Sequence, residues 1–178
     1  MNEDIILEEE AIAEERAEEA RRLGKEILGR PIRDLPAMKP PITVGPQTTI
    51  AEAVERMTQE RIGCMVVVEN EKLVGVFTER DVLTRVVARG VDPRSTAVAE
   101  VMTRDPESLS LEDGIAYALN KMSVGGFRHI PLVDAEGRPT GVVAMRAIVD
   151  YIVDLFPTEV LNLPPAPALG ITREREGA

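Results

Sequence analysis

Two stretches of the chain, residues 49–60 and residues 112–124, carry apolar side chains at helical spacing. Apolar positions i, i+3, i+4 and i+7 lie on one face of an α-helix. These positions are Ile50, Ala53, Val54 and Met57 in the first stretch and Ile115, Ala118, Leu119 and Met122 in the second. The pattern therefore predicts two helices that each bury one face.

Each of these stretches is followed by two short apolar, β-branched runs and by a second amphipathic segment. The runs pair as 65–69 with 73–78 and as 130–134 with 140–144, with polar residues between them, which is typical of β-hairpins. The closing segments are Asp81 to Arg89, with Val82, Val86 and Val87 apolar, and Arg146 to Leu155, with Ile148, Ile152 and Val153 apolar. We expect a helix in each closing segment.

The two series of elements form an internal repeat. A shift of 65 residues aligns the first helices, and after one inserted residue a shift of 66 aligns the hairpins and the closing helices. The aligned pairs include Val44 with Leu109, Ile50 with Ile115, Met57 with Met122, Gly75 with Gly141 and Val82 with Ile148. A β-α-β-β-α unit of about 60 residues does not bury both of its helix faces alone. We therefore predict an α+β fold in which two such units pack through their sheets.

The ends of the chain differ from the repeats, which we bound at residues 31–91 and 92–156. Residues 1–30 are rich in Ala, Glu, Arg and Leu and predict an acidic N-terminal helix, either docked on another surface or solvated. Residues 157–178 hold proline or glycine at six positions and predict an extended tail, either seated in a groove or disordered. Composition leaves both pairs of alternatives open.

Composition and charge exclude several classes of function. Of the 178 residues, 31 are acidic and 21 are basic, and a net charge of −10 argues against non-specific nucleic-acid binding. Aromatic residues make up 3%, so the core is expected to be aliphatic. Cys64 and His129 are the single cysteine and histidine, so we expect no internal disulfide and no zinc site. We find no basic leader and no apolar run of roughly 20 residues, and we expect a cytoplasmic protein without a membrane span.

A motif at the end of each hairpin connects the repeat to a known family. The first copy is Gly75-Val76-Phe77-Thr78-Glu79-Arg80-Asp81, while Val101-Met102-Thr103 opens the second repeat and Phe127-Arg128-His129-Ile130-Pro131-Leu132-Val133-Asp134 enters its hairpin. Over residues 32–156 the chain resembles a CBS-domain pair, or Bateman module. The resemblance implies a homodimer that binds AMP, ADP or ATP, or S-adenosylmethionine, between its repeats and regulates an unidentified protein.

Thr78 and Asp81 are the main candidate binding residues. They lie where a strand is expected to pass into a helix, so Thr78 can cap the helix while its hydroxyl and the helix amides face a phosphate. Asp81 has two acceptor oxygens for the hydroxyls of a ribose, as in the family. The alternative is that Thr78 only caps the helix and Asp81 only interacts with its dipole. The second copy has Ala144 and Ala147 at these positions, so we predict one competent site per chain.

Three further cationic or titratable candidates surround these two residues. Arg128 and His129 correspond to family positions near ligand phosphates, and the alternative is an exposed arginine and a locally bonded histidine. Arg80 can neutralise another phosphate, although an exposed salt bridge is the simpler role. The resemblance also implies an adenine pocket formed by Ile42, Thr43, Val44, Met65 and Val66, residues that apolar packing explains equally well.

The sequence favours a binding role over catalysis. It shows no paired carboxylates, no Ser-His-Asp set and no phosphate-binding loop followed by Lys-Ser or Lys-Thr. The leading hypothesis is a regulatory module that senses an adenosine-containing ligand and passes its occupancy to a partner protein. The alternative is an interaction module of the same fold that binds no nucleotide, and it predicts that replacing Thr78 or Asp81 has no effect on function.

Overall fold

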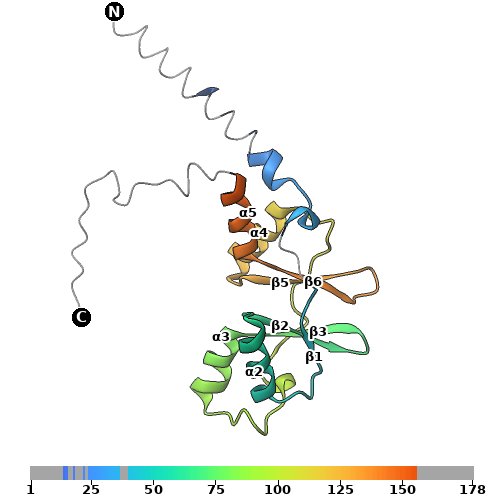
Figure 1. Ribbon diagram of the computed structural model, residues 1–178, viewed down its shortest axis with the longest axis vertical. Helices are drawn as coiled ribbons and strands as arrows, with labels where there is room; N and C mark the ends of the chain where they lie inside the picture. Colours follow the sequence, from blue (N-terminus) through green and yellow to red (C-terminus); the bar gives the residue numbers. More distant parts are fainter. Residues whose placement is uncertain (1–13, 16–17, 19–21, 23, 37–39, 156–178) are drawn as a thin grey trace, which may run out of the picture.

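The computed structural model describes residues 14–15, 18, 22, 24–36 and 40–155. Within these ranges the chain forms two lobes whose sheets face each other, with the helices on the outer sides (Figure 1). This arrangement confirms the predicted α+β fold of two units packed through their sheets. Residues 24–28 are helical, in agreement with the N-terminal prediction. Of residues 1–23 only 14, 15, 18 and 22 are described, and the predicted tail at 157–178 lies outside the described residues.

The first lobe is built on a four-stranded sheet in the order β1-β2-β3-β4. Its strands are β1 (Thr43–Val44), β2 (Cys64–Glu69), β3 (Lys72–Thr78) and β4 (Thr103–Arg104). β1 runs parallel to β2, and the other neighbours are antiparallel. The helix α2 (Ile50–Glu60) begins at the Thr49 capping box and buries Ile50, Ala53 and Met57. These residues, with Met65, Val67 and Phe77, form an almost wholly aliphatic core around one buried phenylalanine.

The second lobe repeats the plan with a smaller sheet. It contains α4 (Ile115–Gly125), the antiparallel strands β5 (His129–Val133) and β6 (Pro139–Ala144), and α5 (Met145–Leu155). Leu109 forms a parallel bridge to Leu132, in the position that β1 occupies beside β2 in the first lobe. The predicted first helix of this repeat begins three residues later than expected, because Ser110 and Asp113 form a hydrogen-bonded turn before it.

The closing helix of the first repeat differs from its prediction. It begins at Glu79 as α3 (Glu79–Asp81), continues as the π-helical segment η2 (Val82–Val86) and ends as the 3-10 segment η3 (Val87–Arg89). A π-helical segment has more residues per turn than an α-helix, so the spacing expected for an α-helix no longer holds. Val86 is buried, but Val87, predicted on the same apolar face, is 67% exposed.

The segments that lead into each repeat pack on the lobe of the other repeat. Ile32 and Leu35, around the 3-10 turn η1 (Ile32–Asp34), lie in the second core, where the Ile32 amide donates to Asp113 O at 2.8 Å. Val98 and Val101, around the turn η4 (Val98–Glu100), lie in the first core. The packing units therefore cross the sequence boundaries drawn at residues 31 and 92.

Candidate functional site

A cleft of about 390 Å³ lies between the two lobes. Its walls come from the end of β3 and the start of α3, from the chain around β4, and from the turn between α4 and β5. It brings together five of the residues singled out from the sequence, which are Thr78, Arg80, Asp81, Arg128 and His129. The first three belong to one repeat and the last two to the other, so the site is completed by both repeats.

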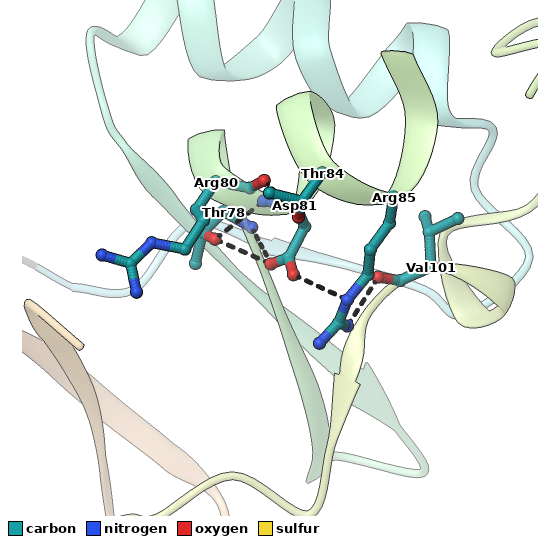
Figure 2. A network of polar contacts seen from close by, with 6 residues as sticks. All are labelled: Thr78, Arg80, Asp81, Thr84, Arg85 and Val101. Carbon is teal, nitrogen blue, oxygen red and sulfur yellow. Dashed lines mark hydrogen bonds and ion pairs between the residues drawn. The ribbon is translucent and has the colours of Figure 1, made fainter. Parts of the chain in front are cut away.

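Thr78 and Asp81 form a capping box where β3 passes into α3 (Figure 2). The amide and the hydroxyl of Thr78 donate to Asp81 Oδ2 at 2.9 and 2.7 Å, and the Asp81 amide lies 3.4 Å from the Thr78 hydroxyl oxygen. Thr78 has the extended backbone typical of an N-cap residue. The capping role proposed as the alternative is therefore present, and it fixes the Asp81 carboxylate at the cleft wall with 5% of the residue exposed.

Arg85 is a cleft residue that the sequence analysis did not single out. Its Nε lies 3.3 Å from Asp81 Oδ1, and its Nη1 donates to Val101 O at 2.9 Å (Figure 2). The signal was visible as an acid followed four residues later by a base on a predicted helix. The guanidinium thus joins the candidate carboxylate to the chain that leads into the second repeat.

Arg80 crosses from the first lobe to the second. Its Nη1 donates to Gly126 O at 2.7 Å, and Gly126 ends α4 in the left-handed region with φ 67°. The simpler role expected for Arg80 was an exposed salt bridge, but the structure gives it this backbone acceptor instead. This hydrogen bond connects the two repeats at the rim of the cleft.

His129 and Cys64 occupy equivalent strand positions in the two repeats, with His129 opposite Ala144 and Cys64 opposite Thr78. Burial and the nearby Arg128 lower the pKa of His129, against a smaller opposing effect of Glu79, so the imidazole is neutral at pH 7. Burial, with a contribution from the Asp81 charge, raises the pKa of Cys64 to about 12. Neither group contributes charge to the cleft at neutral pH.

Acidic side chains that were missed in the sequence also line the cleft. They are Glu79, Asp105 and Glu107, and they stand with Asp81 against the cations Arg80, Arg85 and Arg128. Glu107 is paired with Lys121 at 3.0 Å. Asp105 and Glu107 lie two and four residues after Thr103, which belongs to the motif that opens the second repeat, so their position in the sequence was the available signal. The cleft therefore carries both acidic and basic side chains and is not a purely cationic site for anions.

The residues expected around an adenine lie elsewhere. Thr43 and Val44 line a separate hollow of about 430 Å³ beside α2, together with Arg56, which donates to Thr43 O at 3.1 Å. Met65 and Val66 are fully buried in the sheet, where apolar packing accounts for them. Ile42 packs against the first core and accepts from the Val66 amide at 3.2 Å. None of the five residues lines the cleft that holds Thr78 and Asp81, although Met65 and Val66 lie on the strand that pairs with β3.

The second copy of the motif offers different chemistry. Ala144 ends β6, Ala147 lies in the first turn of α5, and neither side chain can bind a ribose or a phosphate through a hydrogen bond. The position equivalent to Arg85 is Tyr151, whose buried hydroxyl has no hydrogen-bond partner among the residues that the structure describes. The two repeats thus differ at three positions that correspond by the internal repeat.

Among residues 14–15, 18, 22, 24–36 and 40–155, no three His, Cys, Asp or Glu side chains are grouped closely enough to hold a metal ion. None of the helices in this part of the chain has the length and apolar character needed to cross a bilayer.

Comparison with known sequences identifies two matched regions. The profile of the CBS domain family matches residues 32–88 and 98–154. A CBS domain-containing protein of Arabidopsis thaliana is 39% identical over 102 residues, which are 57% of this chain and 19% of that protein. An uncharacterized 17.7 kDa protein of Acidianus ambivalens is 32% identical over 113 residues, which are 63% of this chain and 67% of that protein. The chain spans about a fifth or less of the length of the first curated relatives it matches.

Solved structures share the fold. A conserved protein from Pyrococcus horikoshii superposes with a TM-score of 0.63 at 26% identity, covering 69% of this chain and 92% of that one. A CBS domain pair in complex with 5′-methylthioadenosine and S-adenosyl-L-methionine gives a TM-score of 0.61 at 25% identity, covering 68% and 98%. A CBS domain protein from Pyrobaculum aerophilum complexed with AMP gives 0.63 at 24% identity, covering 71% and 98%.

Proposed function

Because this chain belongs to the CBS-domain family and carries two copies of the domain in tandem, we propose that it is a regulatory module that binds an adenosine-containing ligand in the cleft between its repeats. The observation that carries the proposal is the meeting of Thr78 and Asp81 from one repeat with Arg128 and His129 from the other, around a cleft of about 390 Å³. The chemistry of these groups suits binding rather than catalysis, so we infer a regulatory and not an enzymatic role.

Within the proposed site, Asp81 takes the ribose and the cations take the phosphate. The Thr78 hydroxyl already donates to Asp81, so the phosphate falls to the cations, among which Arg128 offers the forked geometry that suits phosphate. We assign the adenine to the wall formed by Val76 and Pro106, which line this cleft, and not to the group from Ile42 to Val66 around the other hollow.

The mixed charge of the cleft favours a ligand with few phosphates. The carboxylates of Glu79, Asp81, Asp105 and Glu107 offset the three arginines, so each additional phosphate meets repulsion as well as attraction. We therefore place AMP and S-adenosylmethionine ahead of ADP and ATP. The solved CBS domain pair in complex with 5′-methylthioadenosine and S-adenosyl-L-methionine supports an adenosine-containing ligand by resemblance.

A thermal-shift titration tests the proposal. We expect AMP or S-adenosylmethionine to raise the melting temperature of nucleotide-free protein in a concentration-dependent way, with ATP the weakest of the series. A ligand at 100 times its dissociation constant stabilises by about 2.7 kcal/mol, or roughly 5 to 10 °C for a chain of this size. The absence of a shift with every adenosine ligand, in protein that melts cooperatively, would contradict the proposal.

One observation favours the alternative, an interaction module that binds no nucleotide. Both oxygens of Asp81 already have partners within the chain, because Oδ2 accepts from Thr78 and Oδ1 faces Arg85. In that case the output would be carried by surfaces outside the cleft. In both versions the chain acts on a partner protein, and the single, buried cysteine suits a cytoplasmic location.

We further propose that the chain is a homodimer joined through its outer helices. Large apolar side chains stand exposed there, namely Leu83, Val87, Tyr117, Val124 and Val149, with Val124 82% exposed. Sedimentation equilibrium at micromolar concentration is expected to give twice the chain mass of 19.5 kDa. Val87→Asp, which places a charge on this face, should shift the equilibrium toward monomer, and a wild-type monomer would exclude the dimer.

A further inference from the structure

One oxygen of the Asp81 carboxylate is already saturated by the chain itself. Oδ2 accepts from the amide and from the hydroxyl of Thr78, at 2.9 and 2.7 Å. A carboxylate has about four lone-pair positions, two on each oxygen. These two donors therefore fill Oδ2, and a ligand hydroxyl can reach it only by breaking the helix cap.

The other oxygen, Oδ1, faces Arg85. The Arg85 Nε lies 3.3 Å from Oδ1, so the guanidinium stands over one approach to this oxygen (Figure 2). The separation exceeds the roughly 2.7 to 2.9 Å of a strong charge-assisted hydrogen bond. Among the described residues, no other cation pairs with Oδ1, which leaves one acceptor position open toward the cleft.

Arg85 is held in this place from its other end. Its Nη1 donates to Val101 O at 2.9 Å, and Val101 itself is 5% exposed in the first core. The next residue, Met102, is also buried, and its amide donates to Val98 O at 2.8 Å. The carbonyl that anchors Arg85 therefore belongs to a fixed segment, and the guanidinium cannot leave Asp81 without giving up this bond.

We propose that Arg85 determines the specificity of the cleft by limiting Asp81 to one ribose hydroxyl. The inference rests on the proposed function, because it concerns how the same cleft recognises an adenosine ligand. With Oδ2 filled and Oδ1 half covered, the carboxylate has a single position for a hydroxyl donor. The ligand class of the site therefore includes deoxyadenosine nucleotides that retain the hydroxyl bound by Asp81.

Calorimetric titration of the wild-type chain with AMP, 2′-deoxy-AMP and 3′-deoxy-AMP tests this. We expect one deoxy ligand to bind within about threefold of AMP and the other to bind roughly 10- to 150-fold more weakly, the effect of losing one hydrogen bond to a charged group. Comparable losses with both deoxy ligands would overturn the inference while leaving the proposed function intact. Wild-type affinity for both deoxy ligands would also overturn it, because Asp81 would then bind neither ribose hydroxyl.

Failure of the wild-type chain to bind AMP at all is a different result, because it defeats the proposed function and the inference together. Arg85→Met keeps a long apolar side chain but removes the guanidinium, so both positions on Oδ1 open. In this variant we expect both deoxy ligands to bind more weakly than AMP, and Arg85→Lys to restore tolerance of one. An Arg85→Met variant with unchanged selectivity would overturn the role of Arg85.

The second repeat offers a matched control. Arg146 Nε lies 3.5 Å from Asp150 Oδ2 in another pair four residues apart on a helix, at an exposed place outside the cleft. Arg146→Met removes this pair and should keep the wild-type pattern with the three ligands. Melting curves of all variants separate loss of fold from change of selectivity.

Discussion

Replacing Asp81 with alanine is expected to weaken binding of the adenosine ligand by roughly 10- to 150-fold, because a hydrogen bond to a charged group contributes about 1.5 to 3 kcal/mol. The same change removes the acceptor of two Thr78 hydrogen bonds and the partner of Arg85, so the chain should also lose about 1 kcal/mol of stability. Titration calorimetry measures the first effect and thermal unfolding the second.

Asp113→Ala is the matched control for this prediction. Asp113 Oδ2 accepts from the amide and the hydroxyl of Ser110, at 2.7 and 3.1 Å, in the same arrangement but outside the cleft. It should therefore reproduce the loss of stability and leave ligand binding unchanged. If both variants lost affinity equally, the effect of Asp81 would reflect weakened structure and not contact with the ligand.

Replacing Phe77 with alanine is expected to lower the free energy of unfolding by about 3 to 5 kcal/mol, the usual effect of removing a buried phenylalanine side chain. Phe77 is fully buried in β3, opposite Met65 on β2, and no other phenylalanine lies in the first core among the described residues. Such a loss corresponds to roughly 6 to 20 °C in melting temperature for a chain of this length. Denaturant titration with a tryptophan-independent probe, such as circular dichroism, measures it.

Val143→Ala provides the comparison in the second lobe, since Val143 is the fully buried counterpart of Phe77 in β6. Because each core contains a segment from the other side of the repeat boundary, both variants should shift a single transition. A Phe77→Ala chain with two transitions, one still at the wild-type midpoint, would show that the lobes unfold independently.

The fold could be predicted because the same series of helical and strand patterns occurs twice along the chain. Ile50, Ala53 and Met57 and their counterparts in α4 are buried as their spacing indicates. Val87 was misplaced because it directly follows Val86, and adjacent residues on a helix point about 100° apart, so only Val86 faces the core. The π-helical turn at Val82–Val86 was also not expected. Side-chain spacing alone does not reveal an extra residue in a helical turn.

The site could be predicted in part. The pairing of Thr78 with Asp81 is local, since a cap and an acid three residues later form their contacts within one turn. Asp105 and Glu107 were missed because they reach the cleft through long-range packing, in which β4 pairs with β3 of the preceding repeat. The adenine group rested on the resemblance alone and stays a prediction; Thr43 and Val44 line a separate hollow, and Met65 and Val66 are buried in the sheet.

The lead-in segment of each repeat packs on the lobe of the other repeat, and this packing limits how such a chain can be divided or recombined. A fragment cut at the boundary between the sequence repeats would leave the first core without Val98, Val101 and Met102, and would leave the second core without Ile32 and Leu35. Neither half contains all the residues of its own core. Gene fusions, circular permutations and repeat transplants must therefore carry both lead-in segments, because the pair of repeats is the smallest unit in which both cores are complete.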